Sequence, residues 1–216
     1  MGRLGVVALV LAAFLTGCTS SGDQVDDREY GATVEACDLV VQTTAAILAE
    51  ELTETPPSPS PEPTRTSTER VDMTVCRHAF GDPDHVPIAP YDERARDTPG
   101  TPLYRYTSVT AMRFHAADGQ SGTELARHWL TSDPQPKVPD LATLGLDDGD
   151  ITHRQNGVQS YTRIRAVDAN LALIIEYGGA NGNAKPPGMP AEASRRGALR
   201  LLTEAAARRP CTKSDC

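Results

Sequence analysis

The chain has 216 residues, with 21 Lys and Arg against 29 Asp and Glu, and a net charge of −8. This acidic balance argues against binding to nucleic-acid phosphates or to anionic lipid headgroups, because both need clustered Lys and Arg. The length suits one domain with tails, and 17 glycines and 17 prolines place sizeable segments outside a hydrophobic core.

Residues 2–17 have the layout of a bacterial secretion signal, in which one arginine precedes an apolar run over residues 4–15. The run is shorter than the roughly 20 residues that a membrane-spanning helix needs, and it has the length of a signal-peptide core. It ends in Leu-Thr-Gly-Cys, which resembles the lipobox of bacterial lipoproteins, with Cys18 as its cysteine. Residues 1–17 are therefore predicted to be a lipoprotein signal peptide.

The lipobox resemblance implies two acyl chains, of the palmitate type, on Cys18. Two chains give a durable membrane anchor, whereas one gives only marginal binding. Residues 19–34 are polar, small and acidic, so residues 18–34 are expected to be the lipidated cysteine and a flexible tether with a reach of roughly 20–25 Å. The expected location is the extracytoplasmic face of the cell membrane.

Four cysteines remain after Cys18 is set aside, and an even number in an oxidising compartment predicts disulfides. They are Cys37, Cys76, Cys211 and Cys216. Three connectivities are possible. We favour Cys37–Cys76 with Cys211–Cys216, because the second pair lies in a short polar tail, 211–216, that can close on itself. A metal site is not expected, since there is no Cys-x-x-Cys and no histidine at ligand spacing.

The first half of the chain predicts one helix and two strands. Residues 35–52 are expected to be helical, because apolar side chains recur there at three- and four-residue spacing. Residues 53–69 carry five prolines among Ser, Thr and Glu, and are expected to be a disordered, solvated insertion. The alternation over 71–80 predicts a strand. Residues 81–102, again rich in proline, are expected to be a surface loop before a second strand over 103–114.

The second half begins with a capping box, in which Ser121 caps a helix over about 122–131 and Glu124 reaches back to it. Three closely spaced strands are predicted over residues 151–155, 158–167 and 171–177. The last of them is the most apolar and is expected to lie centrally in a sheet. A final helix with one apolar stripe is predicted from Pro190 to about Arg208.

This order of elements predicts an α+β fold. We expect a single domain over residues 35–210, built as an antiparallel sheet of about five strands with three helices packed on one face. The Pro-rich insertion lies inside this domain, because the two favoured disulfide partners, Cys37 and Cys76, flank it.

A family resemblance rests on the lipobox, the polar tether, a helix that opens with Cys37-Asp38-Leu39, a strand that carries Cys76, and the segment Gly-Leu-Asp-Asp-Gly at 145–149. In this layout the chain resembles small actinobacterial lipoproteins of unknown function, of the LpqN type, whose α/β domain is PsbP-like. The resemblance covers about residues 35–210. It implies a non-catalytic protein of the cell envelope and supplies no functional residues.

No motif in the sequence predicts catalysis or a cofactor. The histidines are scattered and form no zinc-hydrolase pair, at His78, His85, His115, His128 and His153. The capping role explains Ser121. Asp147, Asp148 and Asp150 are interpreted as an acidic turn, because the spacing of a calcium-binding loop is absent. We therefore expect no enzyme.

Aromatic side chains on the predicted strands and on one helix could line an apolar groove that accepts a lipid or a peptide, or could simply belong to the core. They are Tyr104, Tyr106, Trp129, Tyr161 and Tyr177. The predicted function is a membrane-anchored interaction module that binds another envelope protein. The alternative is a carrier of a small amphipathic or lipid ligand in the groove, which a continuous apolar cavity would favour.

Overall fold

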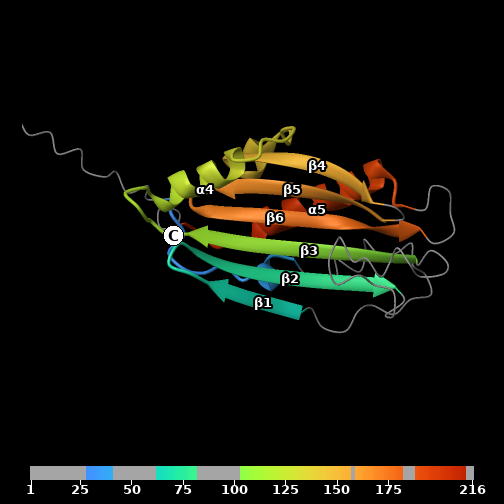
Figure 1. Cartoon of the computed structure of the whole chain (residues 1–216), viewed down its shortest axis with the longest axis horizontal. Coiled ribbons are helices and arrows are strands. Elements are labelled where there is room, and N and C mark those ends of the chain that lie inside the picture. The colour runs from blue at the N-terminus through green and yellow to red at the C-terminus, as the bar shows by residue number, and fades with distance from the viewer. Residues whose placement is uncertain (1–27, 41–61, 82–102, 157–158, 182–187, 213–216) are drawn as a thin grey trace, which may run out of the picture.

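The computed structural model describes residues 28–40, 62–81, 103–156, 159–181 and 188–212. Within these ranges the fold is α+β, with one antiparallel sheet in the order β1-β2-β3-β6-β5-β4 (Figure 1). The strands are β1 (Glu62–Ser67), β2 (Val71–Gly81), β3 (Leu103–Phe114), β4 (Asp148–Asn156), β5 (Gln159–Asp168) and β6 (Leu171–Asn181). The helices are α1 (Ala36–Leu39), α4 (Gly122–Thr131), α5 (Ala191–Arg208) and a 3-10 helix, η1 (Leu141–Leu144).

The predicted strands after residue 70 are confirmed, and the most apolar of them, β6, lies inside the sheet between β3 and β5. Strands β4, β5 and β6 form the expected meander. The turn between β5 and β6 places Ala169 in the left-handed region, at a φ of 49°, and this residue is fully buried. Of the expected surface loop 81–102, Gly81 ends β2, and residues 82–102 lie outside the described residues.

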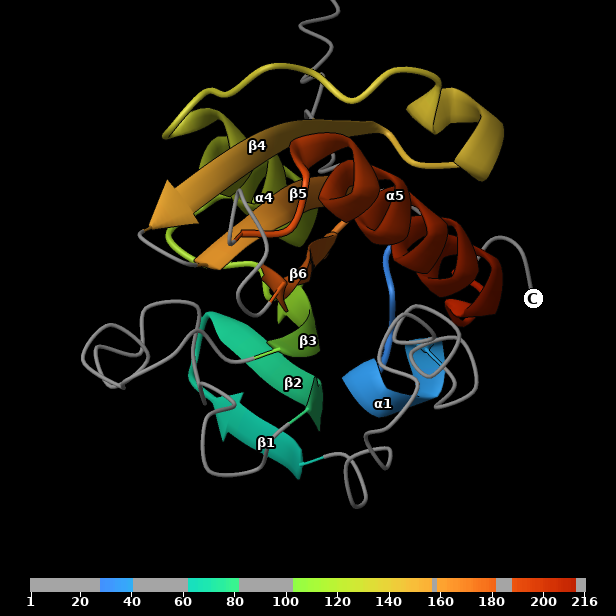
Figure 2. The same cartoon turned by 90° about the vertical axis from the view of Figure 1, so that its right-hand side faces the viewer.

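The prediction that all helices pack on one face of the sheet is wrong. Leu173, Ile175 and Tyr177 of β6 belong to the core cluster that includes α1 and α5, whereas the alternate residues Ala172 and Ile174 pack with α4. Figure 2 shows α1 and α5 on one side of the strands and α4 on the other. The reason is that β6 is apolar on both faces, so each face requires a cover.

Helix α5 covers the larger cluster, as its apolar stripe predicts. Its side chains Ala198, Leu201, Leu202 and Ala205 are fully buried. Gly197 allows the helix to approach the sheet closely, because a Cβ atom built on it would lie 2.2 Å from Cδ1 of Tyr177. The aromatic ring of Tyr177 is therefore a packing element of this core.

Helix α1 is much shorter than the predicted helix over 35–52. It ends at Leu39, because Val40 has extended backbone (φ −134°, ψ 121°). The β-branched pair Val40-Val41 and the following Thr43-Thr44 have low helix propensity, which the apolar spacing alone did not reveal. Residues 41–52 lie outside the described residues.

Part of the predicted disordered insertion forms the sixth strand. Strand β1 pairs with β2 at the edge of the sheet, with Pro63 opposite Cys76, and its side chains from Pro63 onward are exposed. A proline is tolerated on an edge strand, and Thr64 and Thr66 favour extended backbone. The strand buries no apolar side chain, so hydrophobic periodicity could not indicate it. Residues 53–61 lie outside the described residues.

The capping box at the start of α4 is confirmed. The backbone N–H of Glu124 donates to Oγ of Ser121 at 3.2 Å, and the N–H of Ser121 donates to Oε2 of Glu124 at 2.8 Å. The helix buries Ala126 and Leu130 against the sheet. Trp129 packs at the edge of this cluster, with its ring centroid 6.3 Å from that of Phe114.

Candidate functional site

The five aromatic residues predicted to line one groove do not share one surface. Tyr106 and Tyr161 lie together on the α4 face of the sheet, with ring centroids 6.4 Å apart, and Trp129 lies on the same side. Tyr177 lies on the opposite face, in the core beneath α5. The side chain of Tyr104 lies outside the described residues.

Ion pairs occupy the α4 face beside these rings. Arg163 binds Glu176 at 2.6 Å and lies over the ring of Tyr161, 5.9 Å from its centroid. Arg165 binds Asp150 at 2.6 Å and lies 5.5 Å from the ring centroid of Trp129. Each guanidinium therefore satisfies a partly buried carboxylate and covers a ring, which makes this face a packed polar layer.

The acidic residues of the segment 145–150 have protein partners. Asp150 pairs with Arg165, Asp148 accepts from Nζ of Lys137 at 2.6 Å, and Asp147 accepts from the backbone N–H of Ala169 at 3.1 Å. In the described part of the chain, no three metal-binding side chains come together. Asp148 and Asp150 lie on β4 itself and not in the predicted turn before it, and these contacts give the three carboxylates a structural role.

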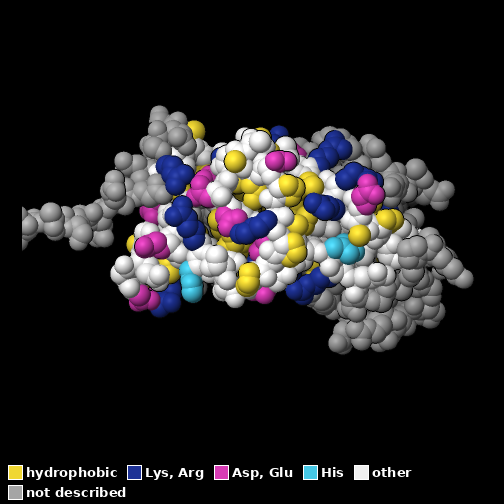
Figure 3. All heavy atoms as spheres, turned by 90° about the horizontal axis from the view of Figure 1, so that it is seen from above, with side chains coloured by type: hydrophobic (Ala, Val, Ile, Leu, Met, Phe, Trp, Pro, Cys, Tyr) yellow, Lys and Arg dark blue, Asp and Glu magenta, His cyan; other side chains and the backbone are white. Residues whose placement is uncertain are grey.

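A surface hollow lies beside β4, the strand at one edge of the sheet. The preceding segment 136–138 pairs antiparallel with part of this edge, because the N–H of Ile151 donates to the carbonyl of Pro136 at 2.8 Å and the N–H of Val138 donates to that of Gly149 at 3.2 Å. Past Pro136 the edge opens into a hollow of about 400 Å³, lined by Pro136, Ile151, His153, Thr162, Ala191, Glu192 and Arg195. Figure 3 looks onto this side of the molecule, where apolar side chains gather between charged ones.

A chain of hydrogen bonds orients His153 at the hollow. Oγ of Ser194 lies 2.8 Å from the carbonyl oxygen of Tyr177 and 2.8 Å from Oγ1 of Thr162, which lies 3.3 Å from Nδ1 of His153. A carbonyl only accepts and a hydroxyl has one proton, so Ser194 donates to Tyr177, Thr162 donates to Ser194, and Nδ1–H of His153 donates to Thr162.

This assignment leaves Nε2 as the acceptor of the imidazole ring. Burial lowers the pKa of His153 from its ordinary value, which favours the neutral ring. The hydroxyls of Thr162 and Ser194, both fully buried, are satisfied by the same chain of bonds. The hollow therefore has an apolar floor with no unsatisfied hydroxyl beneath it.

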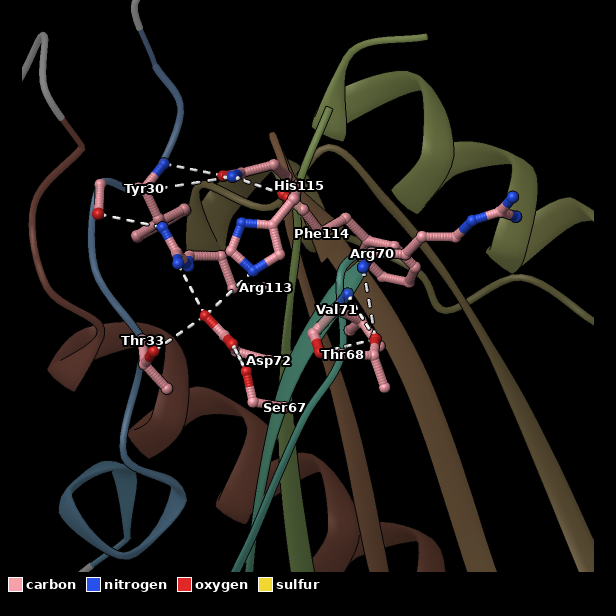
Figure 4. Close-up of polar contacts among 12 residues, drawn as sticks. Tyr30, Thr33, Ser67, Thr68, Arg70, Val71, Asp72, Arg113, Phe114 and His115 are labelled. Atoms are coloured by element: carbon pink, nitrogen blue, oxygen red, sulfur yellow. Dashed lines mark hydrogen bonds and ion pairs between the residues drawn. The ribbon is translucent and has the colours of Figure 1, made fainter. Parts of the chain in front are cut away.

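The N-terminal segment is fastened to the sheet by Asp72, as Figure 4 shows. The Asp72 carboxylate accepts from the hydroxyl of Ser67, from Thr33 at 3.0 Å and from the guanidinium of Arg113 at 2.6 Å. The hydrogen bonds from Ser67 and Arg113 hold the pKa of Asp72 well below its usual range. Arg113 also donates to the carbonyl of Gly31 at 2.9 Å, so the network ties residues 31–33 to β2 and β3.

A second network fastens the same segment to the last helix. The hydroxyl of Tyr30 donates to Asp168 at 2.5 Å, and Nε of Arg209 donates to the same carboxylate oxygen at 2.8 Å. Burial, and then the bond to Asp168, raises the pKa of Tyr30. Tyr30 and Val34 are only 2% and 4% exposed, so the packed domain begins before the expected boundary at residue 35. A single aromatic residue within the polar tether was the one sequence signal for this contact.

The predicted disulfide between Cys37 and Cys76 is confirmed, with Cα atoms 5.0 Å apart. Cys211 is exposed and has no disulfide partner among the described residues, and its predicted partner Cys216 lies outside them, so the second pairing stays a prediction. Cys18 and the signal peptide also lie outside them. No helix in the described ranges is long and apolar enough to cross a membrane.

Of the scattered histidines, His78 is buried on β2, where burial lowers its pKa. Its Nδ1 lies 3.4 Å from Oγ1 of Thr107. His115 lies 3.1 Å from the Asp72 carboxylate, His128 is exposed on α4, and His85 lies outside the described residues. Of the histidines that the structure describes, His153 is the one that lines the hollow.

Comparisons of the chain with models of protein families, with curated proteins and with solved structures give no match.

Proposed function

We propose that the chain is a lipoprotein of the LpqN type, held on the extracytoplasmic face of the cell membrane by acyl chains on Cys18, and that its domain is a non-catalytic module that binds another envelope protein. The observation that carries the second part is the hollow beside the open edge of β4. An apolar recess next to the edge of a sheet offers a partner protein both side-chain contacts and backbone hydrogen bonds.

The alternative, a carrier of an amphipathic ligand, requires one continuous apolar groove. The aromatic residues expected to line it are divided between two faces of the sheet, with Tyr177 under α5 and Tyr161 on the α4 face. The ion pairs of Arg163 and Arg165 fill the space beside the rings that share a face. This arrangement favours the interaction module.

The geometry of the N-terminal segment supports the anchored orientation. Tyr30 lies twelve positions after Cys18, so the lipid lies at most about 40 Å from the place where Tyr30 is bound. Tyr30 binds Asp168 at the end of β5, which is the left-hand end of the sheet in Figure 1. The second half of β4 extends toward the other end, so the hollow is accessible from the cell exterior in the proposed anchored state.

Replacing Cys18 with serine is expected to abolish lipid attachment, because the proposed acyl chains are carried by its thiol. Cells fed with radioactive palmitate should label the wild-type chain and leave Cys18→Ser unlabelled and released from the membrane fraction. Cys211→Ser is the matched control and should keep its label, since Cys211 is an exposed cysteine of the folded domain. Undiminished labelling of Cys18→Ser would overturn the lipoprotein proposal.

A photo-crosslinking amino acid at position 195, on the rim of the hollow, is expected to trap a partner protein in living cells. The control position is Arg70, which is exposed at the opposite edge of the sheet with a side-chain exposure of 66%. A discrete, protease-sensitive adduct from position 195 and none from position 70 is the expected result. An adduct that extracts into organic solvent would support the carrier instead, and no adduct at 195 would contradict a module that binds through this hollow.

A further inference from the structure

The outer edge of β4 presents unused backbone groups. Alternate residues of an edge strand in an antiparallel sheet direct their N–H and C=O groups away from the neighbouring strand. The hydrogen bonds of Gly149 and Ile151 to the segment 136–138 show that the odd-numbered residues of β4 face outward. His153 and Gln155 therefore face outward as well, and within the described ranges no backbone bond to them from outside the sheet is present.

Proline explains why the internal pairing stops where it does. The residue opposite Ile151 is Pro136, whose carbonyl accepts from the N–H of Ile151. In a continuing ladder the same residue would donate its own N–H to the carbonyl of Ile151, but proline has no N–H. The chain before it turns onto the α4 face, where the carbonyl of Asp133 accepts from the Arg165 guanidinium. The strand-like pairing of the chain with this edge is therefore limited to the three residues 136–138.

The hollow lies where the missing strand would continue. Pro136, Ile151 and Ala191 supply an apolar lining, and the hydroxyl of Thr162 is satisfied by Ser194 and His153. Glu192 on the rim pairs with Arg196 at 2.5 Å. An apolar side chain that enters from the edge would therefore meet apolar neighbours and displace no internal hydrogen bond.

We propose that the outer edge of β4, at the outward-facing residues His153 and Gln155, binds an extended peptide segment of the partner protein by β-strand addition, with one apolar side chain of that segment in the hollow. This rests on the proposed function and names its site and the chemistry of its partner. In strand addition, hydrogen bonds between the peptide backbone and the outward N–H and C=O groups of the edge strand give affinity, and a pocket for side chains of the peptide gives specificity. The segment continues the direction of residues 136–138, antiparallel to β4.

The short length of the open edge favours a peptide over a second copy of the domain. The three residues from His153 to Gln155 span roughly 10 Å, and the segment 136–138 covers β4 up to Ile151. A stable dimer interface buries more than about 1,000 Å², which a pairing of two such short edges does not provide. The opposite edge of the sheet, β1, carries Pro63 and Arg65, and such residues disfavour strand addition.

Gln155→Pro tests the backbone bonds, because the outward N–H of residue 155 is not part of the β4–β5 ladder and an edge strand tolerates proline. Gln155→Ala is the matched control. The probe is a fluorescein-labelled octapeptide of alternating Val and Thr, measured by fluorescence anisotropy with the full chain in detergent. We expect it to bind the wild type and Gln155→Ala equally, and Gln155→Pro at least tenfold more weakly. The same peptide N-methylated at alternate residues on its pairing edge should also bind at least tenfold more weakly.

Ala191→Trp provides a second test that leaves β4 unchanged and keeps the proposal falsifiable if Gln155→Pro does not fold. An indole ring at position 191 should fill the hollow and weaken peptide binding, whereas Ala142→Trp, at an exposed position of η1, should not. Equal affinity for the N-methylated peptide, or no binding to the wild type, would overturn strand addition. So would a dimer in sedimentation that Gln155→Pro abolishes, since it would identify a second copy as the occupant.

The cellular crosslink separates this inference from the proposed function. If the protein adduct from position 195 persists in Gln155→Pro and in Ala191→Trp, the domain binds a partner by another mode and strand addition is wrong. If the wild type forms no adduct, the proposed interaction module itself fails.

Discussion

Replacing Cys37 and Cys76 together with serine is expected to lower the free energy of unfolding by about 2–5 kcal/mol. The bond joins α1 to β2 across a sequence separation of 39 residues. On the chain-entropy model, closing a loop of that length stabilises the folded state by roughly 4 kcal/mol, because it restricts the unfolded chain. Urea unfolding of the wild type and of the double variant, at one pH and temperature, gives the difference.

Hydrogen bonds of residues 34–36 to β2 do not depend on the disulfide. The N–H of Ala36 donates to Oγ1 of Thr74 at 2.9 Å, and that hydroxyl donates to the carbonyl of Val34 at 2.6 Å. These bonds keep residues 34–36 on the sheet in the variant, so the folded structure should survive. Ala142→Ser, at an exposed position of η1, is the control and should change the free energy by less than about 0.5 kcal/mol, since surface substitutions rarely do more. A loss below 1 kcal/mol in the double variant would show that the unfolded chain is already restricted in this region.

The sequence predicted the elements whose stability comes from buried apolar side chains. The alternation in β2 and the stripe of α5 each have one dominant period, β6 is a short continuous apolar run, and the capping box at Ser121 has a local mechanism. Strand β1 was not predicted because its backbone pairing with β2 stabilises it, and its polar side chains give no signal. The packing of helices on both faces was missed, although the segment 171–177 is apolar at consecutive positions.

The candidate site was less predictable for a different reason. The hollow depends on where Pro136 ends a pairing with Ile151 and on how the start of α5 meets β5, and these are contacts between distant segments. The hydrogen bond from Tyr30 to Asp168 spans 138 residues. One sequence contains no information on such pairs beyond residue type, so His153 looked the same as the other scattered histidines.

Arg209→Ala is expected to lower the free energy of unfolding by about 3–5 kcal/mol. The guanidinium binds the buried carboxylate of Asp168 at 2.8 Å, and it donates to the backbone carbonyls of Leu144, Gly145 and Ala206. Alanine would leave the carboxylate paired only with the hydroxyl of Tyr30 and would leave three carbonyls without this donor. Removal of one partner of a buried ion pair costs far more than the net value of the pair, because the other charge stays desolvated.

Arg209→Lys and Tyr30→Phe separate the charge from the geometry of the guanidinium. Lysine keeps the positive charge but not the planar guanidinium that reaches several acceptors at once. The free energy of unfolding of Arg209→Lys should therefore lie between that of the wild type and that of Arg209→Ala. Tyr30→Phe removes one hydrogen bond to Asp168 and should cost about 1 kcal/mol. Proteolysis at Arg28 should accelerate in Arg209→Ala, because Tyr30 then loses the contact between Nε of Arg209 and its hydroxyl at 3.0 Å. A lysine variant as stable as the wild type would show that the charge of Arg209, and not its set of hydrogen bonds, holds the N-terminal segment against the last helix.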